Sequence, residues 1–160
     1  MTVLNPAPGD IASTGRRSGG NKVDLRYLED ARDALTSVMA ITQAVSDRSA
    51  DHILARDALT VQTRQLAAIS ACLRAWDQLE TPGTRHVASE PLPAPHGPTP
   101  DRVYADQLTA HAHASIAAAR AEMVAGASPG ARAIAQDAIR AQYRQLAALD
   151  LLSAPQAGKR

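Results

Sequence analysis

The same run of residues occurs twice in this chain, 80 positions apart. Laid over residues 135–149, residues 55–69 carry identical side chains at most positions, and Leu59 and Ile69 are matched by other aliphatic residues. Frequent alanine could produce some of these identities, but it does not account for a shared aspartate and a shared Gln-x-Arg-Gln-Leu at one offset. We therefore interpret the chain as a tandem duplication. The identical positions of the first copy are Ala55, Asp57, Ala58, Gln62, Arg64, Gln65, Leu66, Ala67 and Ala68.

Four segments have apolar side chains at alternating spacings of three and four residues, which is typical of one face of an α-helix. They predict one helix over 24–46, a second over 51–79, a third over 101–125 and a fourth over 129–152. Asp24 is the expected N-cap of the first helix. Because only a short polar turn joins the first two helices, we expect them to lie antiparallel and in contact.

The expected fold is all-α, a four-helix bundle built from two tandem α-hairpin repeats. One hairpin alone leaves an apolar stripe exposed, and a second copy covers it. The linker is rich in proline and long enough to extend along the whole bundle, so the direction of the third helix relative to the second stays open. The expected organisation is a disordered tail over 1–22, a single bundle domain over 23–154 with repeats at 24–79 and 101–152 and a linker at 81–100, and a flexible end over 155–160.

The charge balance and the apolar runs exclude several classes of function. The chain holds 17 Lys and Arg against 16 Asp and Glu, a net charge of +1, so no nucleic-acid or membrane partner is expected. No apolar run approaches the roughly 20 residues of a membrane-spanning helix, and residues 1–21 contain no signal-peptide core, so we expect a cytoplasmic protein. Cys72 is the one cysteine, which excludes an intramolecular disulfide.

No catalytic residues are expected, because no constellation that supports catalysis is visible. An enzyme needs a nucleophile beside a base, a metal with an open position, or paired carboxylates held in the core. Here the acidic residues alternate with arginine as on a solvated helix face, and Glu122 is interpreted as one of them. The chain is therefore not expected to be an enzyme.

Gln62 and Gln142 interrupt the apolar stripes of the second and fourth helices at the same repeat position. We expect them to form a buried polar pair, hydrogen-bonded to each other or to tyrosine hydroxyls. The favoured interpretation is that the pair specifies helix register, as a polar residue does in a coiled-coil core. The alternative is support for a metal site from its second coordination shell.

His111 and His113 are the histidines that suggest metal binding. Residues two apart on a helix point to different sides, so the two cannot chelate one ion. His111 is the speculative metal ligand. The simpler interpretation is that His111 borders the core near Tyr104 and Ser115, whereas His113 faces solvent.

The pattern Asp-x-x-aromatic, then a helix, a turn and Gln-x-x-(Glu/Gln)-aliphatic resembles a bacterial family of duplicated ferritin-like helical hairpins. The resemblance covers residues 24–76 and 101–152. That family is known mainly as a domain of unknown function, and it includes periplasmic copper-binding proteins. The resemblance implies a ferritin-like bundle and a copper site made of a His-His pair and several Met on the first helix of a hairpin. At the histidine positions this chain has Ala34-Leu35 and His111-Ala112, and at the Met positions it has Ala31, Ile41, Leu108 and Ala118.

Two classes of function are therefore expected. The first is a non-catalytic helical-bundle protein that acts in protein interaction or self-association. The alternative is a copper-type metal-binding protein, in which copper is the cofactor and His111 is the one ligand retained from the family pattern.

Overall fold

The computed structural model describes residues 20–48, 53–77 and 100–153, and these ranges form four α-helices without a strand. The expected all-α class and the four-helix bundle are confirmed, and the helix ends lie within about two residues of those predicted. The tail over 1–19, the linker over 78–99 and the end over 154–160 lie outside the described residues. The helices are α1 (Lys22–Arg48), α2 (Ile53–Asp77), α3 (Pro100–Ala125) and α4 (Pro129–Ser153).

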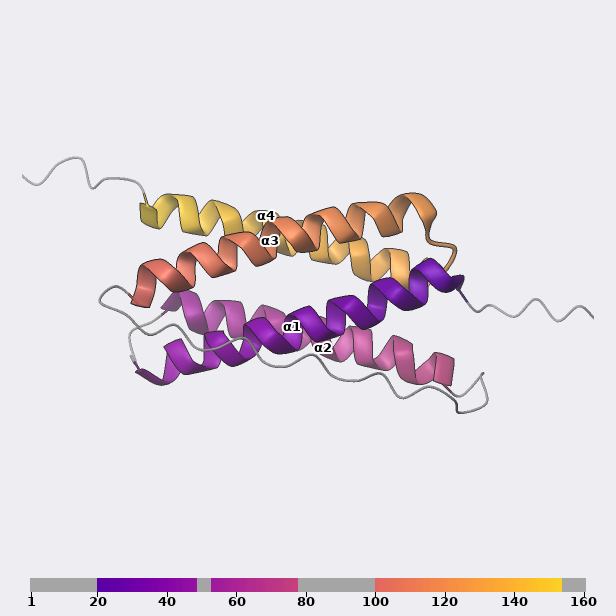
Figure 1. Cartoon of the computed structure of the whole chain (residues 1–160), viewed down its shortest axis with the longest axis horizontal. Coiled ribbons are helices and arrows are strands. Elements are labelled where there is room, and N and C mark those ends of the chain that lie inside the picture. Colours follow the sequence, from indigo (N-terminus) through magenta and orange to yellow (C-terminus); the bar gives the residue numbers. More distant parts are fainter. Residues whose placement is uncertain (1–19, 49–52, 78–99, 154–160) are drawn as a thin grey trace, which may run out of the picture.

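The helices form two antiparallel hairpins that pack side by side (Figure 1). Helix α1 packs on α2 and α3, and α4 packs on α3 and α2, whereas α2 and α3 lie on a diagonal. The Tyr104 hydroxyl at the start of α3 donates a hydrogen bond to Thr42 Oγ1 (3.2 Å) in the C-terminal half of α1. Helix α3 therefore begins at the end of the bundle where α1 ends. As a result, α2 and α3 run parallel, which answers the question that the linker left open.

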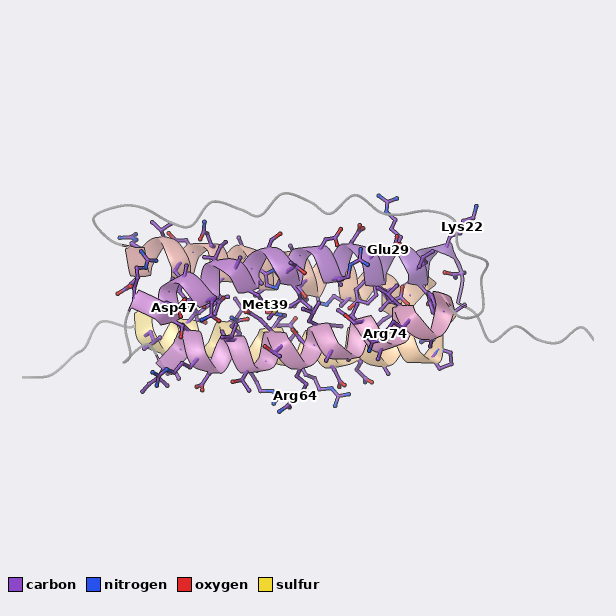
Figure 2. All side chains as sticks on the ribbon, turned by 90° about the horizontal axis from the view of Figure 1, so that it is seen from below. Lys22, Glu29, Met39, Asp47, Arg64 and Arg74 are labelled. Carbon is purple, nitrogen blue, oxygen red and sulfur yellow. The ribbon has the colours of Figure 1, made fainter. Side chains whose placement is uncertain are left out.

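The two copies of the repeat bury the same positions. Ala55 and Ala135 are fully buried, Gln62 and Gln142 are each 2% exposed, and Ile69 and its counterpart Leu149 are buried as well. Figure 2 shows Lys22 and Glu29 of α1 and Arg64 of α2 pointing away from the bundle. Helices α2 and α4 thus present equivalent faces to one core.

Two predictions at the helix ends are wrong. The apolar spacing of the fourth helix places Leu152 on its inward face, but Leu152 is exposed, because α4 extends beyond the core at that end. Asp24 is not an N-cap, because α1 begins two residues earlier. The Asn21 side-chain oxygen takes that role and accepts hydrogen bonds from the backbone N–H groups of Val23 (2.8 Å) and Asp24 (3.0 Å).

Within the described ranges, no helix is long and apolar enough to cross a membrane.

Candidate functional site

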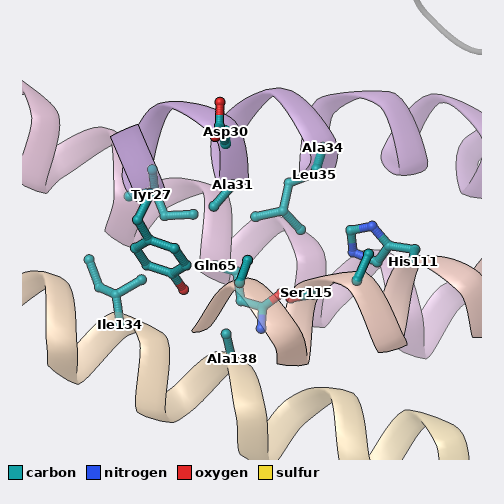
Figure 3. A pocket seen from close by; sticks show the side chains of 13 residues that line it. Tyr27, Asp30, Ala31, Ala34, Leu35, Gln65, His111, Ser115, Ile134 and Ala138 are labelled. Carbon is teal, nitrogen blue, oxygen red and sulfur yellow. The ribbon is translucent and has the colours of Figure 1, made fainter. Parts of the chain in front are cut away.

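A cavity of about 180 Å³ lies between the four helices, and each helix contributes to its wall. In Figure 3, Tyr27 and Ile134 lie on one side of it and His111 on the other, with Gln65 and Ser115 between them. Small side chains on facing helices leave unfilled volume, which well-packed cores avoid. Here the small side chains are Ala31, Ala34, Ala114, Ala118 and Ala138.

A groove of about 620 Å³ lies beside the cavity, between α1 and α3. Four residues line both hollows. They are Asp30 and Ala34 on α1, and His111 and Ala114 on α3.

His111 is half-buried between the two hollows, and its Nε2 atom is buried without a hydrogen-bond partner among the described residues. Burial lowers the pKa of His111 below its ordinary value of 6.5, so the imidazole is neutral at pH 7. Ser115 lines the same cavity, whereas Tyr104 does not and instead bonds to Thr42. His113 is exposed.

The surroundings of His111 supply few further metal ligands. Across 20–48, 53–77 and 100–153, no three His, Cys, Asp or Glu side chains lie close enough together to hold one ion. His111 has one ring nitrogen, Nε2, that is buried and has no hydrogen-bond partner among the described residues.

Gln62 and Gln142 are both buried, but they do not form the hydrogen bond that their repeat positions suggested. Both amide atoms of Gln62 and the Oε1 atom of Gln142 are buried without a partner in the described part of the chain. A buried amide without a partner retains its desolvation cost. The two side chains therefore act in the core as separate polar groups.

Replacing Gln62 by leucine is expected to stabilise the bundle by about 1–2 kcal/mol, because a side chain of similar size removes two unpaired polar atoms. Urea denaturation of the parent and of Gln62→Leu measures the change. The exposed Gln136→Leu is the control and should stay within about 0.5 kcal/mol of the parent. A loss of stability in Gln62→Leu would mean that the amide has a partner in solution.

A second buried polar cluster lies where α1 begins and the α3–α4 turn ends. Asp24 is fully buried there. Its carboxylate accepts hydrogen bonds from the backbone N–H groups of Ala127 (3.1 Å) and Ser128 (2.9 Å), and also from that of Asn21. One carboxylate thus connects the first turn of α1 to the α3–α4 turn.

Glu122 lies beside Asp24 and is 1% exposed, so its placement on a solvated face was wrong. The cause is the last turn of α3, which packs against the start of α1 and turns this side chain inward. When ionised, neither carboxyl oxygen of Glu122 has a donor among the described residues. When protonated, Glu122 donates a hydrogen bond to Asp24.

Glycines make room for both carboxyl groups. A Cβ atom at Gly126 would collide with the Glu122 carboxyl group, and one at Gly20 would collide with Asp24 and with the Trp76 ring. In each case the glycine lies four residues from the acid and just outside the helix that holds the acid.

The pKa values of the two acids move in opposite directions. Burial raises the pKa of Asp24, but hydrogen bonds from Glu122 and from three backbone N–H groups outweigh it and hold the pKa below 3.8. Burial, the hydrogen bond to Asp24 and its charge raise the pKa of Glu122 from 4.5 to about 7, although Arg132 opposes this. The pair therefore holds one proton at about pH 5 and about half a proton at pH 7.

Comparison with known proteins finds no relative. The chain matches no protein-family model, no curated protein and no solved structure. Its candidate sites are therefore defined by the geometry above.

The pattern of apolar residues did not reveal the cavity or the acid pair, although the sequence holds a signal for each. For the acid pair it is a glycine four residues before Asp24 and another four residues after Glu122. For the cavity it is alanine at the facing positions of α1, α3 and α4.

Proposed function

We propose that this protein is a non-catalytic helical bundle that acts by binding, and that the cavity is where it binds a small molecule. The observation that carries the proposal is a largely apolar hollow of about 180 Å³ between the four helices. Largely apolar pockets are the usual binding sites of small molecules. Protein interaction and self-association belong to the same non-catalytic class, and the cavity is the more specific observation.

We also propose that the bundle is ferritin-like and arose by duplication of one hairpin. Equal burial at equivalent positions of α2 and α4 supports the duplication. Parallel α2 and α3 support a ferritin-like arrangement, because they require one long crossover connection, as in ferritin-like folds. A copper function inherited from the family would depend on His111. Because the described residues put no group of three ligands around it, we place an organic ligand ahead of copper.

The cavity is tested by filling it from Ala138. The parent is expected to bind toluene with a dissociation constant of roughly 0.1–1 mM, as a small apolar ligand does in a preformed hollow. Ala138→Leu should stay as stable as the parent, because its larger side chain enters the hollow, and it should no longer bind toluene. Isothermal titration and urea denaturation measure the two effects.

Ala58 provides the matched control, because it is the repeat counterpart of Ala138, is equally buried and does not line the cavity. Ala58→Leu should overpack the core and lose about 1–3 kcal/mol of stability. If Ala138→Leu lost as much, or bound toluene as the parent does, the cavity would not be the binding site.

A further inference from the structure

The end of α3 and the α3–α4 turn are held against the start of α1 by polar contacts. These segments meet at one end of the bundle, where α3 ends and α1 and α4 begin (Figure 1). The Asn21 side-chain amide donates a hydrogen bond to the carbonyl oxygen of Ala125 (2.9 Å). Asp24 accepts from two backbone N–H groups of the turn. Both bonding residues of α1 thus lie at its beginning.

Apolar packing contributes little to the same contact. Ala119 of α3 and Ala131 of α4 are fully buried and fix the helices on either side. Between them Met123 is only partly buried, and Val124 is 88% exposed. A segment with few buried apolar contacts opens at a lower free energy than the core does. Residues 123–128 can therefore separate from α1 while the rest of the bundle stays folded.

Glu122 lies within this contact and has a partner in one protonation state only. Its side chain is 1% exposed, and neither carboxyl oxygen has a donor among the described residues. When protonated, Glu122 donates to Asp24, whereas the ionised form is a second buried negative charge beside the Asp24 carboxylate. A buried charge without partners is strongly unfavourable. Ionisation therefore favours an arrangement in which Glu122 reaches water.

We propose that Glu122 is a pH-dependent switch: when it loses its proton, residues 123–128 separate from α1 and the ionised carboxylate reaches water. In this open form the hydrogen bonds from Ala127 and Ser128 to Asp24 are broken. The rest of the four helices stays packed.

Among the groups that face this site, Glu122 is the one that changes charge between pH 5 and 8. Asp24 and Tyr27 face it from α1, Arg132 faces it from α4, and Cys72 of α2 lies near Asp24. Burial raises the pKa of Asp24, but hydrogen bonds hold it below 3.8, so Asp24 stays ionised. Burial also raises the pKa values of Tyr27 and Cys72 above 10.0 and 9.0, so both stay neutral. Arg132 is a cation and opposes the uptake of a proton by Glu122.

Opening is expected to become more favourable as the pH rises from about 4.5 to 7. In the closed form, burial and Asp24 raise the pKa of Glu122 to about 7, whereas the hydrated carboxyl group of the open form keeps the ordinary value of 4.5. Opening therefore releases a proton between these pH values, and the equilibrium constant for opening rises about tenfold per pH unit. Above pH 7 both forms are ionised and the constant levels off.

Amide hydrogen exchange at pH 5 and pH 8 measures the opening. Each rate is divided by the rate of the unfolded chain at the same pH, which gives a protection factor. In the parent, the protection factors of Ala127 and Ser128 should fall by up to about seventyfold between pH 5 and pH 8, because Glu122 titrates at about 7 in the closed form and at 4.5 in the open form. In Glu122→Gln they should stay nearly constant, because the amide donates to Asp24 at both pH values. Glu29→Gln is the control and should behave as the parent does.

A second comparison locates the opening within the bundle. At pH 8 the protection factor of Ser128 should be at least about tenfold below that of Leu108 in the core, and low concentrations of urea should leave it unchanged, because a local opening exposes little surface. Equal protection of Ser128 and Leu108 would mean that the whole bundle unfolds, and would overturn the switch.

The role of Glu122 has its own contrary outcomes. Constant protection of Ser128 in the parent, or an equal fall in the parent and in Glu122→Gln, would show that this acid does not control the opening. The measurements on the parent at two pH values need no variant, so they decide the matter even if Glu122→Gln fails to fold.

Discussion

Replacing Asp24 by alanine is expected to destabilise the bundle by about 3 kcal/mol, the largest effect of any single substitution considered. Hydrogen bonds to a charged group contribute about 1.5–3 kcal/mol, and a donor left buried without its acceptor keeps its desolvation cost. Asp24→Ala removes the acceptor of two N–H groups in the α3–α4 turn at once. Urea denaturation at pH 5 measures the loss.

Two further variants separate the charge of Asp24 from its shape. Asp24→Asn keeps the shape but points an amide group at backbone donors, so it should lose an intermediate amount. Asp106→Asn removes an exposed carboxylate of α3 and should change stability by about 0.5 kcal/mol or less. A loss below about 1 kcal/mol in Asp24→Ala would contradict the role of this carboxylate in joining the turns.

Stability is expected to fall as the pH rises from about 4.5 to 7, through the ionisation of Glu122. Below pH 4.5 this group is protonated in both the folded and the unfolded chain. Between these pH values the unfolded chain ionises first, because burial and Asp24 raise the folded pKa to about 7. Unfolding then releases a proton, so the free energy of unfolding decreases with pH, by at most about 3 kcal/mol in total. Above pH 7 both states are ionised and the decrease ends.

The titratable and charged groups near Glu122 also affect how the stability of the bundle depends on pH. Asp24 and Tyr27 face it from α1, Arg132 faces it from α4, and Cys72 of α2 lies near Asp24. The lowered pKa of Asp24 contributes stability that is present above 3.8 and is lost as the pH falls below it. The cluster should therefore contribute most to stability between about pH 4 and 5.

Comparing the parent with Glu122→Gln separates the contribution of Glu122 to the pH dependence from that of every other titratable group in the chain. Its amide donates to Asp24 at all pH values, as the protonated acid does. Relative to the parent, Glu122→Gln should be nearly equal in stability at pH 4.5 and more stable at pH 8, by at most about 3 kcal/mol. Denaturation series of both proteins from pH 4 to 8 give the difference, with Glu29→Gln as the control. A constant difference across this range would show that Glu122 does not hold its proton.

Apolar periodicity was sufficient to predict the helices and their inward faces, because both follow from spacing within a helix. The repeat likewise indicated that Gln62 and Gln142 take equivalent positions. What it could not indicate is whether their amides meet, because that depends on how two helices are offset along each other. The structure shows a Gln62 amide with no partner among the described residues.

Charge patterns were a poorer guide than apolar ones. Glu122 alternates with arginine along the sequence, as a solvated residue does, and its burial follows from contact with α1, which is remote in sequence. The cavity was missed for a related reason. An alanine-rich stripe predicts close packing of two helices, and only the arrangement of all four leaves the volume between them unfilled.

The bond between Asp24 and Ser128 joins residues 104 positions apart, and this has a consequence for the order of folding. The cost of closing a loop grows with its length, and contacts between distant residues slow folding. During synthesis α1 and α2 can pair early, whereas Asp24 has no backbone partner in the α3–α4 turn until residue 128 has been made. In a growing chain the Asp24 carboxylate therefore remains without these partners, although it is buried in the folded protein. Formation of its hydrogen bond to Ser128 marks the docking of the second hairpin.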